Sequence, residues 1–166
     1  MRDDRLNELL GNCDRVMQEA DNAGDGGFQL KEGEYIFAVN SAEICKAKNS
    51  DRIQVKLVVT VASGPFNGFT HYSYDMRFTD AEGNPDLRAM GFAQLACSKM
   101  GLGAPRTMEE FGVAISKFEN RVFIGEIKRS KEFTNLRIVR LLHENHSQWV
   151  LEGSPSGATD SDRTGW

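Results

Sequence analysis

The clearest pattern in the chain is an alternation of apolar and polar residues that runs through residues 53–78 and reverses once. The apolar face of the first run carries Ile53, Val55, Leu57, Val59 and Val61, and that of the second carries Thr70, Tyr72, Tyr74, Met76 and Phe78. Successive side chains of a strand point to opposite faces of a sheet, so each run predicts a half-buried strand. The intervening residues 63–68 read Ser-Gly-Pro-Phe-Asn-Gly, a composition typical of chain reversals. The stretch therefore predicts a long antiparallel hairpin at the centre of the fold.

Further strands and helices are predicted on both sides of this hairpin. Residues 35–45 predict a first strand with apolar residues on both faces, as expected of a strand that bends and changes which face is buried. Residues 87–100 have apolar residues at helical spacing after Asp86, a residue suited to cap a helix, and residues 107–110 open a second helix with a capping-box pattern. Residues 121–130 and 133–142 predict two last strands. We expect Tyr35, Phe37, Tyr72, Tyr74 and Phe78 in the core.

The two ends of the chain differ from the middle. Residues 2–20 place Leu6, Leu9, Leu10, Cys13, Val16, Met17 and Ala20 on one stripe of an amphipathic helix. That helix either packs on its own domain or contacts a partner or a second copy of the chain. We expect the helix to occupy residues 1–20, a linker residues 21–27, a folded domain residues 28–151, and a disordered tail residues 152–166. The tail ends in Trp166, a candidate contact for a partner protein.

The order of the elements predicts the fold class. Three strands, a helical insertion and two more strands follow one another, which is the element order of an OB-fold. We therefore expect a mainly β protein: a five-stranded OB-fold barrel with helices between strands three and four, plus the N-terminal amphipathic helix. A β-sandwich requires more strands than this chain supplies.

Composition and charge narrow the function. The 166 residues carry a net charge of −4, yet residues 33–142 carry fifteen basic and twelve acidic residues, so the middle is mildly basic and both ends are acidic. Cys13, Cys45 and Cys97 form neither a disulfide framework nor a Cys-x-x-Cys pattern. No segment approaches the roughly 20 continuous apolar residues of a membrane span, and no secretory signal is visible, which favours the cytoplasm.

Several short motifs in a fixed order resemble a known family. They are Gly33-Glu34-Tyr35, Ala42-Glu43, the strand at residues 53–61, the turn Gly64-Pro65-Phe66-Asn67-Gly68, and Met100-Gly101-Leu102. Together they resemble phage-encoded OB-fold proteins that are similar to single-stranded-DNA-binding proteins, over roughly residues 30–142. The resemblance implies a role in bacteriophage DNA replication or recombination, in the cytoplasm of the host. The N-terminal helix and the tail lie outside it.

The residues themselves also point to nucleic acid. OB-folds bind oligonucleotides across strands two and three and the flanking loops, and single strands are held by a positive groove and aromatic platforms. The candidates for nucleic-acid binding are Lys46, Lys48, Arg52, Lys56, Phe66, Phe69, His71, Arg77, Lys128, Arg129, Lys131, Phe133 and Arg137. The aromatic residues among them lie at turns and are candidates for base stacking. Lysine and arginine also solvate strand faces in proteins that bind no nucleic acid, and that alternative stays open.

Enzymatic alternatives are weaker. The chain has no phosphate-binding Gly-x-x-x-x-Gly-Lys-Ser/Thr loop, and His143 and His146 lack a third metal ligand nearby. Glu126-Ile127-Lys128, with Asp75 upstream, is the best nuclease candidate, because such a set holds a divalent metal in some nucleases. We expect a non-enzymatic, non-sequence-specific single-stranded-DNA-binding protein without metal or cofactor. A metal-dependent nuclease and a protein-interaction module remain the alternatives.

Overall fold

The computed structural model describes residues 4–19, 21–22, 28–130 and 133–152. Its centre is a five-stranded antiparallel sheet in the order β5-β4-β3-β6-β7. The strands are β3 (Gly33–Lys46), β4 (Ile53–Val61), β5 (Thr70–Ser73), β6 (Val122–Ser130) and β7 (Phe133–His143). The first three form a meander and the fourth returns to pair with the first, which is the Greek-key order.

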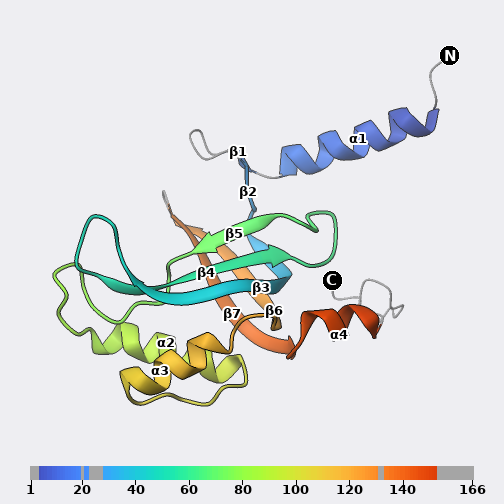
Figure 1. The fold of residues 1–166 in the computed structure, drawn as a ribbon. Coiled ribbons are helices and arrows are strands. Elements are labelled where there is room, and N and C mark those ends of the chain that lie inside the picture. Colours follow the sequence, from blue (N-terminus) through green and yellow to red (C-terminus); the bar gives the residue numbers. More distant parts are fainter. Residues whose placement is uncertain (1–3, 20, 23–27, 131–132, 153–166) are drawn as a thin grey trace.

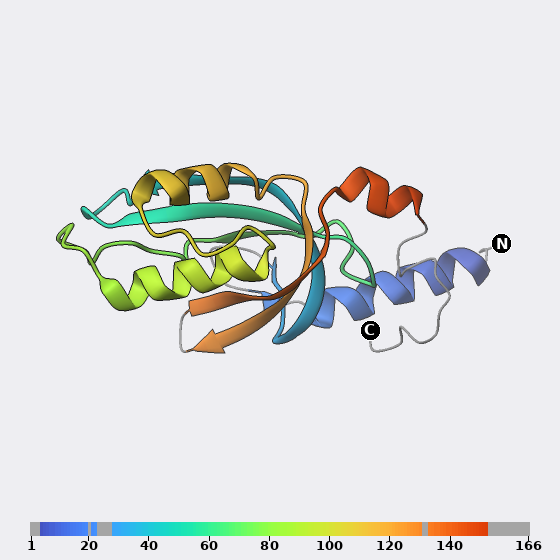
Figure 2. The ribbon, with the colours of Figure 1, turned by 90° about the horizontal axis from the view of Figure 1, so that it is seen from below.

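Two helices occupy the long connection between β5 and β6. These are α2 (Leu87–Lys99) and α3 (Met108–Ser116), which lie together on one side of the sheet (Figures 1 and 2). The side chain of Asp86 caps α2 by accepting a hydrogen bond from Ala89 N at 3.1 Å, and Thr107 caps α3 by accepting one from Glu110 N at 3.1 Å. Both caps were predicted, and the architecture of a five-strand sheet with helices after its third strand is confirmed.

The main core lies between these helices and the inner face of the sheet. The rings of Phe37 and Phe123, on neighbouring strands, lie tilted against each other with their centres 5.5 Å apart, and Phe78 meets Phe111 of α3 edge-on at 4.9 Å. Cys97 of α2 is fully buried in the same cluster, and burial raises the pKa of its thiol to about 11. Cys97 is therefore an uncharged core residue at neutral pH, the role expected for a buried reduced thiol.

Strand β3 changes its buried face part-way along, as the sequence predicted. Its pairing with β4 shifts by one residue between Val39 and Ser41. A β-bulge of this kind reverses the faces of the residues that follow it. Phe37 and Val39 therefore belong to the main core before the bulge, and Ala42 and Ile44 pack against it after the bulge.

The returning half of the central hairpin contains a similar irregularity that the sequence analysis missed. Ser73 pairs with Leu57, and Arg77 bridges to Gln54. Between these two pairs the returning chain advances by four residues, whereas β4 advances by three. One extra residue therefore lies between these two pairs. Side chains alternate between the two faces with a period of two. The extra residue therefore puts the alternation that follows it one step out of phase with the alternation that precedes it.

Tyr72 and Tyr74 consequently lie on the outer face of the sheet, where they are 57% and 44% exposed. The prediction that both belong to the core is wrong. Phe37 and Phe78 are buried as predicted, and Tyr35 is half-buried. The strict alternation in the sequence thus holds for β4 but does not hold across the whole returning segment.

The sheet does not close into a barrel. Strands β5 and β7 are its two edges, and among the described residues they form no strand pair with each other. The predicted closed barrel is therefore not confirmed, although the strands and their order give one continuous antiparallel sheet.

Four further elements lie outside the sheet and its covering helices. Helix α1 (Asp4–Glu19) falls within the predicted N-terminal helix and projects away from the sheet (Figure 1). Strand β1 (Asp21–Asn22), inside the expected linker, pairs with β2 (Phe28–Gln29). Helix α4 (His146–Leu151) was not predicted, and its Trp149 covers a small outer-face cluster formed with Ile36, Ala38 and Val122. None of the described helices is long and apolar enough to cross a membrane.

Candidate nucleic-acid interface

The outer face of β3, β4 and β5 combines exposed tyrosines with basic side chains. Val58 on β4 pairs with Tyr72 on β5, and Lys56 pairs with Glu43 on β3. The surface that we call the tyrosine face comprises Lys48, Lys56, Tyr72, Tyr74 and Arg77. The strand register brings these residues together although they come from three separate stretches of the sequence.

A hollow of about 480 Å³ lies within this face. Lys56 of β4 and Tyr74 of the segment after β5 line it, together with Lys46 at the end of β3 and Lys48 in the β3–β4 connection. Glu43 also lines the hollow and reduces its positive charge. The arrangement offers an aromatic ring beside ammonium groups, which is what a single strand of nucleic acid requires.

The predicted basic residues on this side of the sheet are not equivalent. The Lys46 ammonium donates hydrogen bonds to Ala47 O and Ser50 O at 3.2 and 2.9 Å, so it stabilises its own loop. Lys48 and Arg77 are exposed, and Lys56 is half-buried. Arg52 is half-buried as well, and its Nε is buried without a hydrogen-bond partner among the described residues. Lys48, Lys56 and Arg77 are therefore the side chains best placed to contact phosphates.

Neutral polar groups extend the tyrosine face along the sheet. Asn40 Nδ2 donates to Thr60 Oγ1 at 2.8 Å, and the hydroxyls of Thr60 and Thr70 lie 3.4 Å apart. Asn40 sits at the bulge in β3, and the two threonines are a cross-strand pair. They provide hydrogen-bonding groups beside the aromatic rings.

His71 does not belong to this face. It pairs with Val59 of the inner face, so its imidazole is half-buried on the opposite side from Tyr72. Burial lowers the pKa of His71 below its ordinary value of 6.5, an effect that the nearby negative charge of Asp75 partly opposes. A neutral imidazole contributes no positive charge, so the prediction of His71 as a phosphate contact is not supported by its position.

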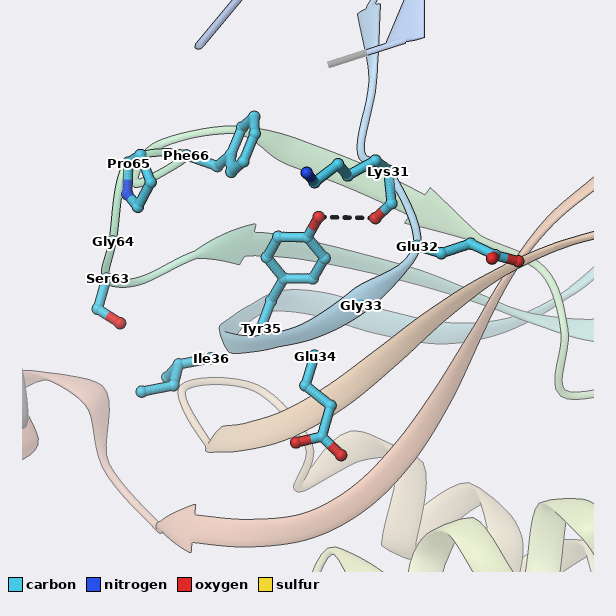
Figure 3. A pocket seen from close by; sticks show the side chains of 10 residues that line it. All are labelled: Lys31, Glu32, Gly33, Glu34, Tyr35, Ile36, Ser63, Gly64, Pro65 and Phe66. Atoms are coloured by element: carbon cyan, nitrogen blue, oxygen red, sulfur yellow. Dashed lines mark hydrogen bonds between the residues drawn. The ribbon is translucent and has the colours of Figure 1, made fainter. Parts of the chain in front are cut away.

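Two of the aromatic residues predicted at turns, Phe66 and Phe69, are not exposed platforms either. Phe66 is only 8% exposed and lies edge-on to Tyr35, with the ring centres 5.9 Å apart. Both rings line a hollow of about 490 Å³, in which the Tyr35 hydroxyl donates to Lys31 O at 2.6 Å (Figure 3). Phe69 is half-buried against the main core. The side chain of Phe133 and all of Lys131 lie outside the described residues.

The remaining basic candidates lie on β6 and β7. Lys128 is exposed, whereas the Arg129 guanidinium hydrogen-bonds Gln29 of β2. Arg137 is bound by the Glu126 carboxylate, with Nη2 and Oε1 2.7 Å apart. Arg129 and Arg137 are thus already engaged by other side chains, although Arg137 is itself exposed. Trp166, the candidate partner contact, lies in the tail beyond the described residues.

The residues of the enzymatic alternatives are also engaged. Glu126 holds Arg137, and Asp75 accepts hydrogen bonds from Ser73 Oγ and Leu136 N at 3.0 and 2.7 Å. His143 Nε2 lies 3.2 Å from Glu152 Oε1. Within the part of the chain that the structure describes, no three His, Cys, Asp or Glu side chains are grouped to hold a metal ion.

No protein-family model and no curated protein matches this chain, so no relative supplies residues for the site. The sequence did not predict Tyr72 and Tyr74 as surface residues, because the alternation of apolar and polar positions assigned both to the core. The signal that could have indicated their exposure is Ser73, a small polar residue between the two tyrosines. Ser73 is 5% exposed and occupies the inner position.

Proposed function

We propose that this protein binds single-stranded DNA, without sequence specificity, across the tyrosine face. Tyr72 and Tyr74 stack on bases, and Lys48, Lys56 and Arg77 hold the phosphates on either side of them. The protein protects or presents the strand and is not itself an enzyme. A role in phage DNA replication or recombination rests on the family resemblance alone.

The observation that carries this proposal is the exposure of two neighbouring tyrosines on a sheet face with basic side chains. Tyrosine is intermediate in burial, but exposed aromatic side chains that are grouped and bordered by polar residues are typical of binding sites. Base stacking on aromatic rings is tolerant of sequence and contributes roughly 1–3 kcal/mol per base, which fits non-specific binding. The face is formed by the second and third strands of the sheet, the strands that OB-folds use for oligonucleotides.

We also propose that the sheet is a partly open OB-fold barrel. Its Greek-key strand order and the helices between the third and fourth strands support this assignment. A side-chain contact between the two sheet edges, from Asp75 to Leu136 N, supports it further.

Titration of a fluorescently labelled oligo-dT with the Tyr72→Ala, Tyr74→Ala and double variants tests the function. We expect each single substitution to weaken binding by about 5- to 150-fold, the equivalent of roughly 1–3 kcal/mol. Tyr72→Phe and Tyr74→Phe keep the rings and are the matched controls, which should bind nearly like the parent. A double alanine variant that binds as tightly as the parent overturns the proposed site.

A further inference from the structure

Two helices of this chain expose apolar faces that nothing in the described structure covers. The first is the stripe on α1 formed by Leu6, Leu9, Leu10 and Cys13, all of which are exposed. The stripe repeats at three- and four-residue steps, so its members share one side of the helix. An amphipathic helix of this length is stabilised mainly by packing of its apolar side, which no described residue of the same chain provides for the α1 stripe.

The second is the outward face of α2, formed by Leu87, Phe92 and Leu95. Leu87 is 83% exposed and Phe92 is 61% exposed, although the other side of the same helix is in the main core. Arg88 and Lys99 flank these residues, and α2 contains no acidic residue. The α2 face is therefore apolar with a basic border.

The two faces do not meet within one chain. Helix α1 lies on the far side of the sheet from α2 and α3 in Figure 1, and the view from below shows it at the opposite end of the molecule from them (Figure 2). The α1 stripe and the α2 face can therefore cover each other only when they belong to two different molecules.

We infer that α1 of one copy docks on the α2 face of a second copy. The faces match in length: Leu6 to Cys13 spans about 10 Å and Leu87 to Leu95 about 12 Å at 1.5 Å per residue. They also match in charge, since α1 contains four acidic and two basic residues, while α2 contains two basic and none acidic. Docking α1 against another α1 instead would bring two acidic helices together, which is electrostatically unfavourable.

The α2 face does not overlap the tyrosine face, because it is on the helical side of the sheet, whereas Tyr72 and Tyr74 are on the outer face. Exchange in both directions, with α1 of each copy on the α2 face of the other, gives a closed two-fold dimer with an isologous interface.

Complementation between two variants tests the inference with the full chain. Leu9→Asp places a charge in the α1 stripe, and Phe92→Asp places one in the α2 face. We expect the parent to show a concentration-dependent mass above the monomer in size-exclusion chromatography with light scattering, and each variant alone to be monomeric. Mixing the two variants should restore a complex, because the intact α1 of one fits the intact α2 face of the other. The mixture is followed by fluorescence anisotropy of a labelled Phe92→Asp chain.

Two substitutions serve as matched charge controls. Asn12→Asp is on α1 but off the stripe, and Leu151→Asp replaces a leucine of α4 that is as exposed as Leu87. Both should associate like the parent, and circular dichroism should show that all variants are folded. A Phe92→Asp chain that still self-associates would mean that α1 pairs with α1. That result overturns the inference, as does a parent that is monomeric at every concentration or a variant mixture that forms no complex.

Discussion

The carboxylate of Asp75 accepts a hydrogen bond from the backbone N–H of Leu136 at 2.7 Å and so joins the two edges of the open sheet. Asp75 follows edge strand β5, and Leu136 lies on edge strand β7. Ser73 Oγ donates to the same carboxylate oxygen at 3.0 Å and orients it. One side chain thus provides, at a single point, the connection that paired strands would provide along a closed barrel.

Removing this carboxylate should destabilise the protein. In Asp75→Ala the Leu136 N–H loses its acceptor, and a hydrogen bond to a charged group contributes about 1.5–3 kcal/mol, toward the lower figure at an exposed site such as this. We expect the free energy of unfolding in urea to fall by about 1–2 kcal/mol. Amide hydrogen exchange at Leu136 should quicken by more than exchange in the centre of β4.

Asp75→Asn is the matched control for this contact. The amide keeps an oxygen acceptor without the charge, so the loss of stability should be smaller than in Asp75→Ala. An alanine variant with unchanged stability and unchanged Leu136 exchange would show that the two edges are held together by the core alone.

The parts of this fold that the sequence predicts are those in which local pattern and tertiary environment agree. Val55, Leu57, Val59 and Val61 alternate and are all buried, and the helix caps at Asp86 and Thr107 combine a capping residue with a following apolar run. Each of these signals lies within a few residues, so no knowledge of the rest of the chain is needed to interpret it.

The site could not be predicted in the same way, because the extra residue between Ser73 and Met76 has no local signal. Tyr74 and Met76 are both apolar positions of one alternating run, yet Met76 is buried and Tyr74 is exposed. Which face each occupies depends on where the segment pairs with β4, a contact about 20 residues away in the sequence. Helix α4 was missed for a different reason: it has six residues, and Trp149 is its only buried one.

Gly125 should not tolerate a side chain. A Cβ at this position of β6 would lie 2.8 Å from Leu136 Cδ1 and 2.9 Å from carbons of both Phe123 and Phe37. Such overpacking typically destabilises a protein by about 1–3 kcal/mol. We therefore expect Gly125→Ala to lower the urea midpoint by a corresponding amount.

Gly112 in α3 provides the control, because a Cβ there meets no atom within 4 Å. Gly112→Ala should stabilise the protein by up to about 1 kcal/mol, the difference in helix propensity. Equal effects of the two substitutions would contradict the close approach at Gly125.

His71 should make the protein less stable in mild acid. Burial lowers the pKa of its imidazole in the folded state below the ordinary 6.5, so the unfolded chain binds the proton more tightly. The stability that the neutral imidazole contributes is therefore present above pH 6.5 and is lost as the pH falls below it. We expect urea unfolding to show a fall in stability between pH 7 and about pH 5.5, before most carboxylates titrate. The fall should be smaller in His71→Gln.

The neighbouring carboxylate gives a second check on the same group. Asp75 raises the pKa of His71, against the larger effect of burial, so Asp75→Asn should lower that pKa further. Titration of the His71 ring by NMR measures this directly. An upward movement of the His71 pKa in Asp75→Asn would mean that the two side chains do not interact in the way the structure indicates.

The tyrosine face should determine how binding depends on salt. If Lys48, Lys56 and Arg77 neutralise phosphates, each contact adds about −0.7 to the slope of log affinity against log salt for a single strand. The triple alanine variant should weaken binding to every sequence and flatten that slope by up to about 2 units. Tyr72→Ala should weaken binding while leaving the slope alone, because stacking releases no counterions.

Lys46→Ala should change the slope less than Lys48→Ala, since the Lys46 ammonium is held by Ala47 O and Ser50 O. Lys117→Ala, directly after α3, is the control for an exposed lysine on the other side of the sheet. A slope that is the same in the parent and the triple variant would mean that the phosphates bind elsewhere. A change of slope in Lys117→Ala as large as in Lys48→Ala would mean that net charge alone causes the effect.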